Sequence, residues 1–209
     1  MNINLPAVVI LLAGLVGNMW AVAGDTLPNG SGTLDFSFIA RPASEGCPIS
    51  VEKSNQSAVI KTSDVPANSD KNKVVVRLSN AFTIQQCRGA LIGLSVDYSV
   101  NDYNDPEIVR GRICHQGGQG GGCSFGSGLS YFVVVPSNIV LYPTRPSYPV
   151  QWNGSSVIPA GQDINHVMTI APDSDNWTFS ADTIVMPMDD QALTAGTMTG
   201  SYTLVLSFD

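Results

Sequence analysis

Short runs of β-branched and aromatic residues recur along the chain, and clusters of turn-forming residues separate them. The clusters are rich in Pro, Asn, Asp and Ser, as at residues 66–72, 101–106, 143–149 and 171–176. Many short strands with such turns are typical of an all-β sandwich or barrel. The pattern predicts strands at Thr33–Ala40, Ser57–Lys61, Lys73–Leu78, Ala90–Val100, Ile108–Cys114, Tyr131–Val135, Ile139–Tyr142, Val167–Ile170, Asn176–Ser180 and Thr197–Phe208.

The segment at residues 30–38 alternates strictly between two kinds of side chain. The odd-numbered positions from Ser31 to Ser37 are polar. The even-numbered positions are apolar or lack a side chain; they are Gly30, Gly32, Leu34, Phe36 and Phe38. Because successive side chains of a strand point to opposite faces, the segment is predicted to be an amphipathic strand.

A second alternating segment stands at the other end of the sequence. Its apolar parity is Tyr202, Leu204, Leu206 and Phe208, and the sequence ends one residue later at Asp209. Terminal residues commonly fray. An amphipathic strand that runs up to the last residue therefore predicts that this end is held by a contact.

The first residues have the character of an export signal. Leu5–Val16 carries no charge, and the small-residue site Ala21-Val22-Ala23 follows it. The run is shorter than the roughly 20 residues that a transmembrane helix needs. We therefore expect a secretory signal peptide at residues 1–23, cleaved after Ala23.

Export changes how the four cysteines are interpreted, because disulfides form in oxidising compartments. Four cysteines allow three pairings. Cys114 and Cys123 bracket a glycine-rich run that can close a small loop, which leaves Cys47 to pair with Cys87. A metal site built on Cys114, Cys123 and nearby histidines does not match the usual zinc spacings, so no metal is expected.

Composition and charge argue against several classes of protein. The chain has 209 residues, a net charge of -7 and only 13% charged residues, against about 25% in a typical soluble protein. Its ten Lys and Arg residues are scattered, whereas nucleic-acid binding needs them on one face. The glycine run lacks the Lys-Ser/Thr ending of a phosphate loop, and no nucleophile elbow is present. We expect no enzyme activity, no catalytic residues and no cofactor.

Three features together resemble the fimbrial subunits (pilins) of the chaperone–usher pathway of Gram-negative bacteria. The first is an early segment of Gly-Thr, apolar and Phe positions before a Cys-x-apolar segment. The second is the spacing of the first two cysteines, and the third is a C-terminal strand with a penultimate aromatic residue. In this sequence they are Gly32-Thr33-Leu34-Asp35-Phe36 with Ile39 and Cys47-Pro48-Ile49, then Cys47 to Cys87, then Tyr202–Asp209.

The resemblance implies an all-β fold, an incomplete immunoglobulin-like β-sandwich that lacks its final strand. It also implies completion by donor-strand complementation, in which a segment of one protein fills the missing strand of another. The expected divisions are a signal peptide at 1–23, a donor-strand extension at 24–38 and a pilin domain at 39–209. The expected donor-strand residues are Gly30, Gly32, Leu34, Phe36 and Phe38, with Gly32 allowing close backbone approach.

The resemblance also implies partners and a location. The C-terminal strand, represented by Tyr202, Leu204, Leu206, Phe208 and Asp209, is expected to dock on a periplasmic chaperone. The other expected partners are an outer-membrane usher, neighbouring fimbrial subunits in a homo- or heteropolymer, and a host glycan or protein as receptor. The protein would be exported through the periplasm to a fimbrium on the bacterial cell surface, where it contributes to adhesion.

Other interpretations stay open. The N-terminal segment also fits an ordinary edge strand of its own domain, and the C-terminal segment fits an ordinary central strand. A secreted sugar-binding or adhesive module, or a minor tip subunit, is the alternative function. Such a module would use Trp152 and Trp177 near Asn153, Asp173 and Asp175. The sequence does not distinguish major, adaptor and terminating subunits.

Overall fold

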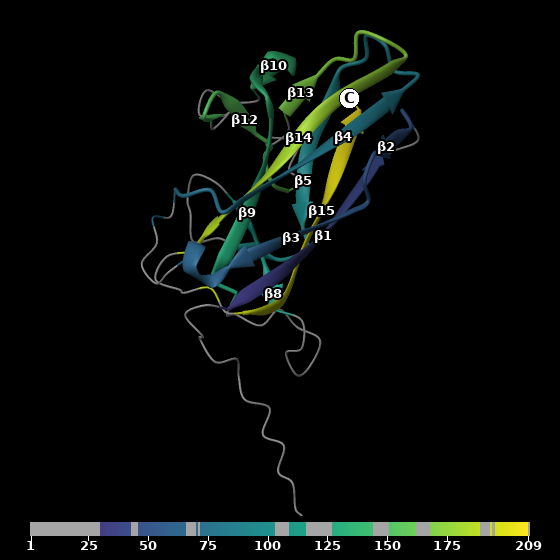
Figure 1. Ribbon diagram of the computed structural model, residues 1–209. Coiled ribbons are helices and arrows are strands. Elements are labelled where there is room, and N and C mark those ends of the chain that lie inside the picture. The colour runs from purple at the N-terminus through teal and green to yellow at the C-terminus, as the bar shows by residue number, and fades with distance from the viewer. Residues whose placement is uncertain are drawn as a thin grey trace, which may run out of the picture.

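The computed structural model describes residues 30–42, 46–65, 70, 72–102, 109–115, 127–143, 151–161, 168–188, 193 and 195–208. The predicted signal peptide and Gly24–Asn29 therefore lie outside the described residues. In the described part, strands form two sheets that pack against each other, and no α-helix is present (Figure 1). The predicted all-β sandwich is confirmed at this level.

The first sheet contains both ends of the described chain. Its strand order is β10-β13-β5-β15-β1-β3, and β8 pairs with β15 outside this path. Figure 1 shows β1, in purple, running beside the yellow β15. The strands are β1 (Ser31–Pro42), β3 (Asn55–Lys61), β5 (Ile92–Tyr98), β8 (Cys114–His115), β10 (Val140–Pro143), β13 (Met168–Ile170) and β15 (Gly196–Phe208).

The second sheet has the order β11-β12-β9-β14-β4-β2, with β7 pairing β9 and β6 pairing β7. Two short 3-10 helices, Thr62–Asp64 and Ser137–Ile139, follow β3 and β9. The strands are β2 (Ile49–Val51), β4 (Val76–Gln85), β6 (Asn101–Asp102), β7 (Arg110–Arg112), β9 (Leu129–Pro136), β11 (Gln151–Trp152), β12 (Ser155–Val157) and β14 (Asn176–Pro187).

The main core lies between the two sheets, as packed inner faces of a sandwich require. Its members come from every long strand, and alternate positions of each strand supply them. In β1, Leu34, Phe36 and Phe38 are 0%, 1% and 2% exposed, while Ser31, Thr33 and Ile39 between and around them are exposed. The predicted amphipathic alternation of this segment is confirmed.

A smaller apolar cluster lies on the outer face of the second sheet. Phe132, Val134, Val157, Ile184 and Met186 form it, with Trp152 packed against them. Phe132, Ile184 and Met186 have the opposite parity to the inward residues of β9 and β14. This cluster explains why β9 is buried along both faces and reads as a continuous apolar run.

Most of the predicted strands are present, but several of their bounds are wrong. The strands predicted at 33–40, 57–61, 131–135 and 197–208 correspond to β1, β3, β9 and β15. The prediction at 176–180 is too short, because β14 continues to Pro187. The prediction at 73–78 begins three residues before β4 and stops seven residues before its end at Gln85. The single strand predicted at 108–114 is wrong, since β7 and β8 are two short pieces.

The hairpin of β11 and β12 was not predicted from the sequence. Asn153 and Gly154 connect its strands, and both have positive φ, 48° and 81°. A two-residue loop with positive φ at both positions is the type I′ turn that Asn-Gly favours. The Trp-Asn-Gly-Ser sequence at 152–155 therefore carried the signal for a hairpin.

Candidate functional site

The N-terminal strand β1 lies inside the first sheet, between β15 and β3. It runs parallel to β15 from the pair Gly32↔Gly196 to the pair Pro42↔Leu206. It runs antiparallel to β3 from Ser31↔Lys61 to Ser37↔Asn55. Among the named strands of the described residues, β1 and β15 are the one parallel pair. In the single chain, therefore, residues 31–38 of the predicted donor segment do not form an edge strand.

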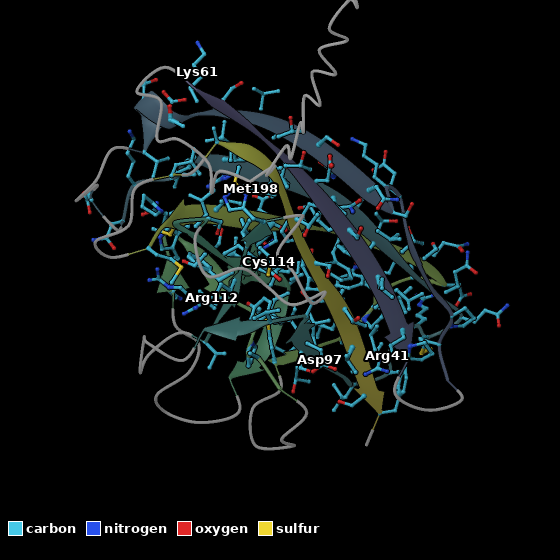
Figure 2. All side chains as sticks on the ribbon, turned by 90° about the horizontal axis from the view of Figure 1, so that it is seen from below. Arg41, Lys61, Asp97, Arg112, Cys114 and Met198 are labelled. Carbon is cyan, nitrogen blue, oxygen red and sulfur yellow. A yellow bond between two sulfur atoms is a disulfide. The ribbon has the colours of Figure 1, made fainter. Side chains whose placement is uncertain are left out.

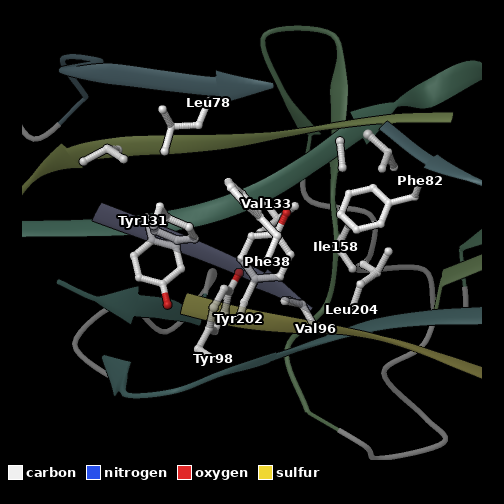
Figure 3. Packing of buried hydrophobic residues seen from close by; sticks show 14 of the residues in the cluster. Phe38, Leu78, Phe82, Val96, Tyr98, Tyr131, Val133, Ile158, Tyr202 and Leu204 are labelled. Atoms are coloured by element: carbon white, nitrogen blue, oxygen red, sulfur yellow. The ribbon is translucent and has the colours of Figure 1, made fainter. Parts of the chain in front are cut away.

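The inward side chains of β1 enter a cluster of aromatic rings. The Phe36 ring makes an edge contact with Tyr131, with ring centroids 4.8 Å apart, and lies 5.9 Å from Tyr202. Phe38 makes an edge contact with Tyr202 at 5.5 Å. Figure 3 shows Phe38 with Tyr98, Tyr131 and Tyr202 around it. Because such rings bury large apolar areas, β1 supplies a substantial part of the core.

Two glycines make room for β1 at its contact with β15. A Cβ at Gly200 would collide with the Phe36 ring, which lies opposite it in the register. A Cβ at Gly32 would lie 2.5 Å from Met198 Cε and 3.1 Å from the carbonyl oxygen of Gly196. The expectation of close backbone approach at Gly32 thus fits its packing within this chain. The pocket over Gly200 was missed, because a lone glycine in a strand gives no sign of its partner.

The outward face of β1 carries polar contacts to the strands on both sides. The Ser57 hydroxyl donates to Asp35 Oδ1 at 2.6 Å, and the Ser37 hydroxyl donates to Asn55 Oδ1 at 2.8 Å. Arg41 reaches across β15, and its Nη2 lies 3.0 Å from Asp97 Oδ2 on β5 (Figure 2). These contacts connect β1 to β3 and β5 in addition to the backbone ladders.

Burial raises the pKa of Tyr98, Tyr131 and Tyr202 above the ordinary value of 10. The Tyr131 hydroxyl donates to the backbone carbonyl of Ser201 on β15. All three phenols therefore stay neutral at physiological pH. The packing around β1 depends on apolar contacts and hydrogen bonds, and no tyrosine there supplies a charge near neutrality.

The C-terminal strand is a central strand in the single chain, paired with β5 on one side and β1 on the other. Tyr202, Leu204 and Leu206 are buried. Phe208 packs over the backbone of Gly46, where a Cβ would lie 2.7 Å from its ring. This contact lies at the described end of the chain, while Asp209 itself lies outside the described residues.

The predicted disulfide between Cys47 and Cys87 is present, with its Cα atoms 5.6 Å apart. It joins Cys47, two residues before β2, to Cys87, two residues after β4. Cys114 is also disulfide-bonded, and its predicted partner Cys123 lies outside the described residues. The first bridge fixes one end of the segment that connects β1 to the rest of the sandwich.

The tryptophans of the alternative sugar-binding hypothesis do not lie together. Trp177 packs against the main core, whereas Trp152 packs on the outer face of the second sheet. The ring of Trp152 also has contacts within the chain, since the Arg77 guanidinium lies 5.7 Å from its centroid and Phe132 makes an edge contact with it. These two residues therefore do not form a joint platform on which a sugar could stack.

No protein-family model matches the chain, and a comparison with curated proteins finds no match. The resemblance to fimbrial subunits thus depends on the sequence features described above. Among the described residues, no group of three or more His, Cys, Asp and Glu side chains is arranged to hold a metal ion. None of the described helices is long and apolar enough to cross a membrane.

Proposed function

We propose that this protein is a structural subunit of a chaperone–usher fimbria that polymerises by donor-strand exchange and contributes to adhesion. One observation carries the proposal: the N-terminal strand β1 fills a place beside the C-terminal strand β15, and it does so in parallel. All the other pairs of named strands among the described residues are antiparallel. A strand of this kind is a candidate for replacement by the same strand of another subunit.

The order of the remaining strands supports the proposal. In an immunoglobulin-like sandwich one sheet has the order A-B-E-D and the other C-F-G. Strands β2-β4-β14-β9 follow the first order, and β5-β15 follow C-F. The place of strand G is taken by β1, which comes from the opposite end of the chain. An incomplete immunoglobulin-like sandwich would explain this arrangement, because a strand that precedes β2 in the chain lies where strand G would pair with β15.

The same reasoning gives the proposed partners a physical role. Without β1, strands β15 and β3 would each expose an unpaired edge, and such edges promote aggregation. A periplasmic chaperone would cover these edges and contact the C-terminal strand during export. An outer-membrane usher would then bring the β1 segment of the next subunit into this place.

Polymerisation can be tested with a chain that carries a second copy of residues 30–42 after Asp209 through a flexible linker. The protein produced from the full-length gene should form oligomer ladders that survive detergent without boiling. The extended chain should remain monomeric, because its own added strand fills the place of β1. The matched control carries the same extension with Leu34, Phe36 and Phe38 of the copy changed to Ser, and it should polymerise like the parent. If the parent, the extended chain and the control are all monomeric, the proposal is contradicted.

A further inference from the structure

The place that β1 occupies does not fix the direction of the strand in it. Because β1 is parallel to β15 and antiparallel to β3, these two flanking strands run in opposite directions. A strand inserted in either direction would form one parallel and one antiparallel ladder. The backbone therefore gives little preference, and side chains must decide which strand stays and in which direction.

The inward side chains of β1 add little to this choice. Leu34 and Phe38 flank Phe36 symmetrically, and the small residues Gly32 and Ala40 follow on either side. A reversed strand centred on Phe36 would again place bulky apolar groups in the central positions and small ones outside them. The inward face thus differs mainly at one position, where Ala40 of a reversed strand would need the space that Gly32 leaves beside Met198.

The outward face is different, because Arg41 has its partner only in the arrangement seen here. Arg41 lies beside Val205, and Asp97 lies across from Thr203 on the far side of β15. A reversed strand centred on the Phe36–Gly200 pair would place Arg41 beside Ala195, eight positions from Thr203, or roughly 26 Å along the strand. The ion pair thus belongs to the parallel strand.

From this geometry we infer that the Arg41–Asp97 ion pair is a latch that holds β1 in its own chain and slows its release for exchange. The inference rests on the proposed function. Both side chains are accessible, with 53% and 32% of their surfaces exposed, so a variant at either position leaves the core intact. Exposed ion pairs contribute little individually, and loss of this one should accelerate release by about two- to fivefold.

The test measures uptake of a fluorescein-labelled peptide of residues 30–42 by the protein produced from the full-length gene, followed by fluorescence anisotropy. Arg41→Ala and Asp97→Asn should each take up the peptide about two- to fivefold faster than the parent. The doubly reversed chain, Arg41→Asp with Asp97→Arg, should return toward the parent rate. High salt should raise the parent rate toward that of the variants, because salt screens exposed charges.

The matched control is Arg77→Ala, which removes a comparable ion pair to Asp182 in the second sheet, with 51% and 25% of the side chains exposed. It should take up the peptide at the parent rate. Equal rates in the parent and both latch variants would overturn the inference while leaving strand exchange intact, and so would equal acceleration by Arg77→Ala. Absence of uptake in every chain would overturn the proposed function together with the latch.

Discussion

The contact between Phe36 and Gly200 provides the most direct test of where β1 packs. Phe36 is 1% exposed and lies against Tyr131, Tyr202 and Phe38. Replacing a buried Phe by Ala costs about 3–5 kcal/mol. With a urea m-value of about 2 kcal/mol/M, the midpoint of unfolding should fall by about 1.5–2.5 M. Ile39→Ala, at a position that is 54% exposed on the same strand, should change stability by less than about 0.5 kcal/mol.

Gly200→Ala makes the test specific for this pair. In the parent its Cβ would collide with the Phe36 ring, so the change should destabilise by about 1–3 kcal/mol through overpacking. In the Phe36→Ala background the ring is gone, and the same change should stabilise by about 0.5–1 kcal/mol, because Gly is unfavourable within a strand. The effect should therefore reverse its sign, with a coupling energy of about 1.5–4 kcal/mol.

The assay is equilibrium urea unfolding of the four chains of this double-mutant cycle, followed by tryptophan fluorescence and by circular dichroism. Each chain is measured at two protein concentrations, so that a contact within one chain is distinguished from one between chains. A coupling near zero, with Gly200→Ala having the same effect in both backgrounds, would refute the placement of Phe36 over Gly200.

Three further predictions concern stability. Replacing Cys47 and Cys87 by Ser opens a loop with a sequence separation of 40 residues and should cost about 4 kcal/mol in urea unfolding; an unchanged midpoint would contradict this. Burial raises the pKa of Tyr98 above 10, so the neutral phenol stabilises the folded state fully below pH 10, and this stabilisation is lost as the pH rises above 10. Tyr98→Phe should therefore reduce the alkaline loss of stability measured by unfolding from pH 8 to 12. Gly154→Ala, at φ +81°, should lower the melting temperature by several degrees, whereas no change would argue against the type I′ turn.

The sequence was sufficient to predict the elements whose signal is local. Strict alternation identified β1, and the cysteine count with one flexible loop identified the first disulfide. The second half of β4 was missed because Asn80 interrupts its apolar pattern. Asn80 is 3% exposed, and its side chain exchanges hydrogen bonds with the backbone of Lys53. A polar residue satisfied by tertiary partners cannot be recognised from propensity.

The sequence predicted the residues of the candidate site but not which strands they would lie beside. The alternation of apolar and polar residues identifies the strand and its inward side chains. Arg41 and Asp97 are separated by 56 positions, and only the register of three strands brings them together. The direction of β1 had no sequence signal either, because a strand flanked by opposite neighbours fits its ladders in both directions.

The energetics of β1 indicate that a partner protein would accelerate the proposed exchange. Exposing Leu34, Phe36 and Phe38 costs about 1.5–3 kcal/mol each, or about 5–9 kcal/mol together, comparable to the whole stability of a typical domain. The released form would then be present at only about one part in 10^4 to 10^7. Release also deprives β3 of its one partner strand in the described sheet. Spontaneous exchange should therefore be slow, and in the proposed fibre a protein that binds β15 and β3 while β1 is absent would determine when a subunit joins.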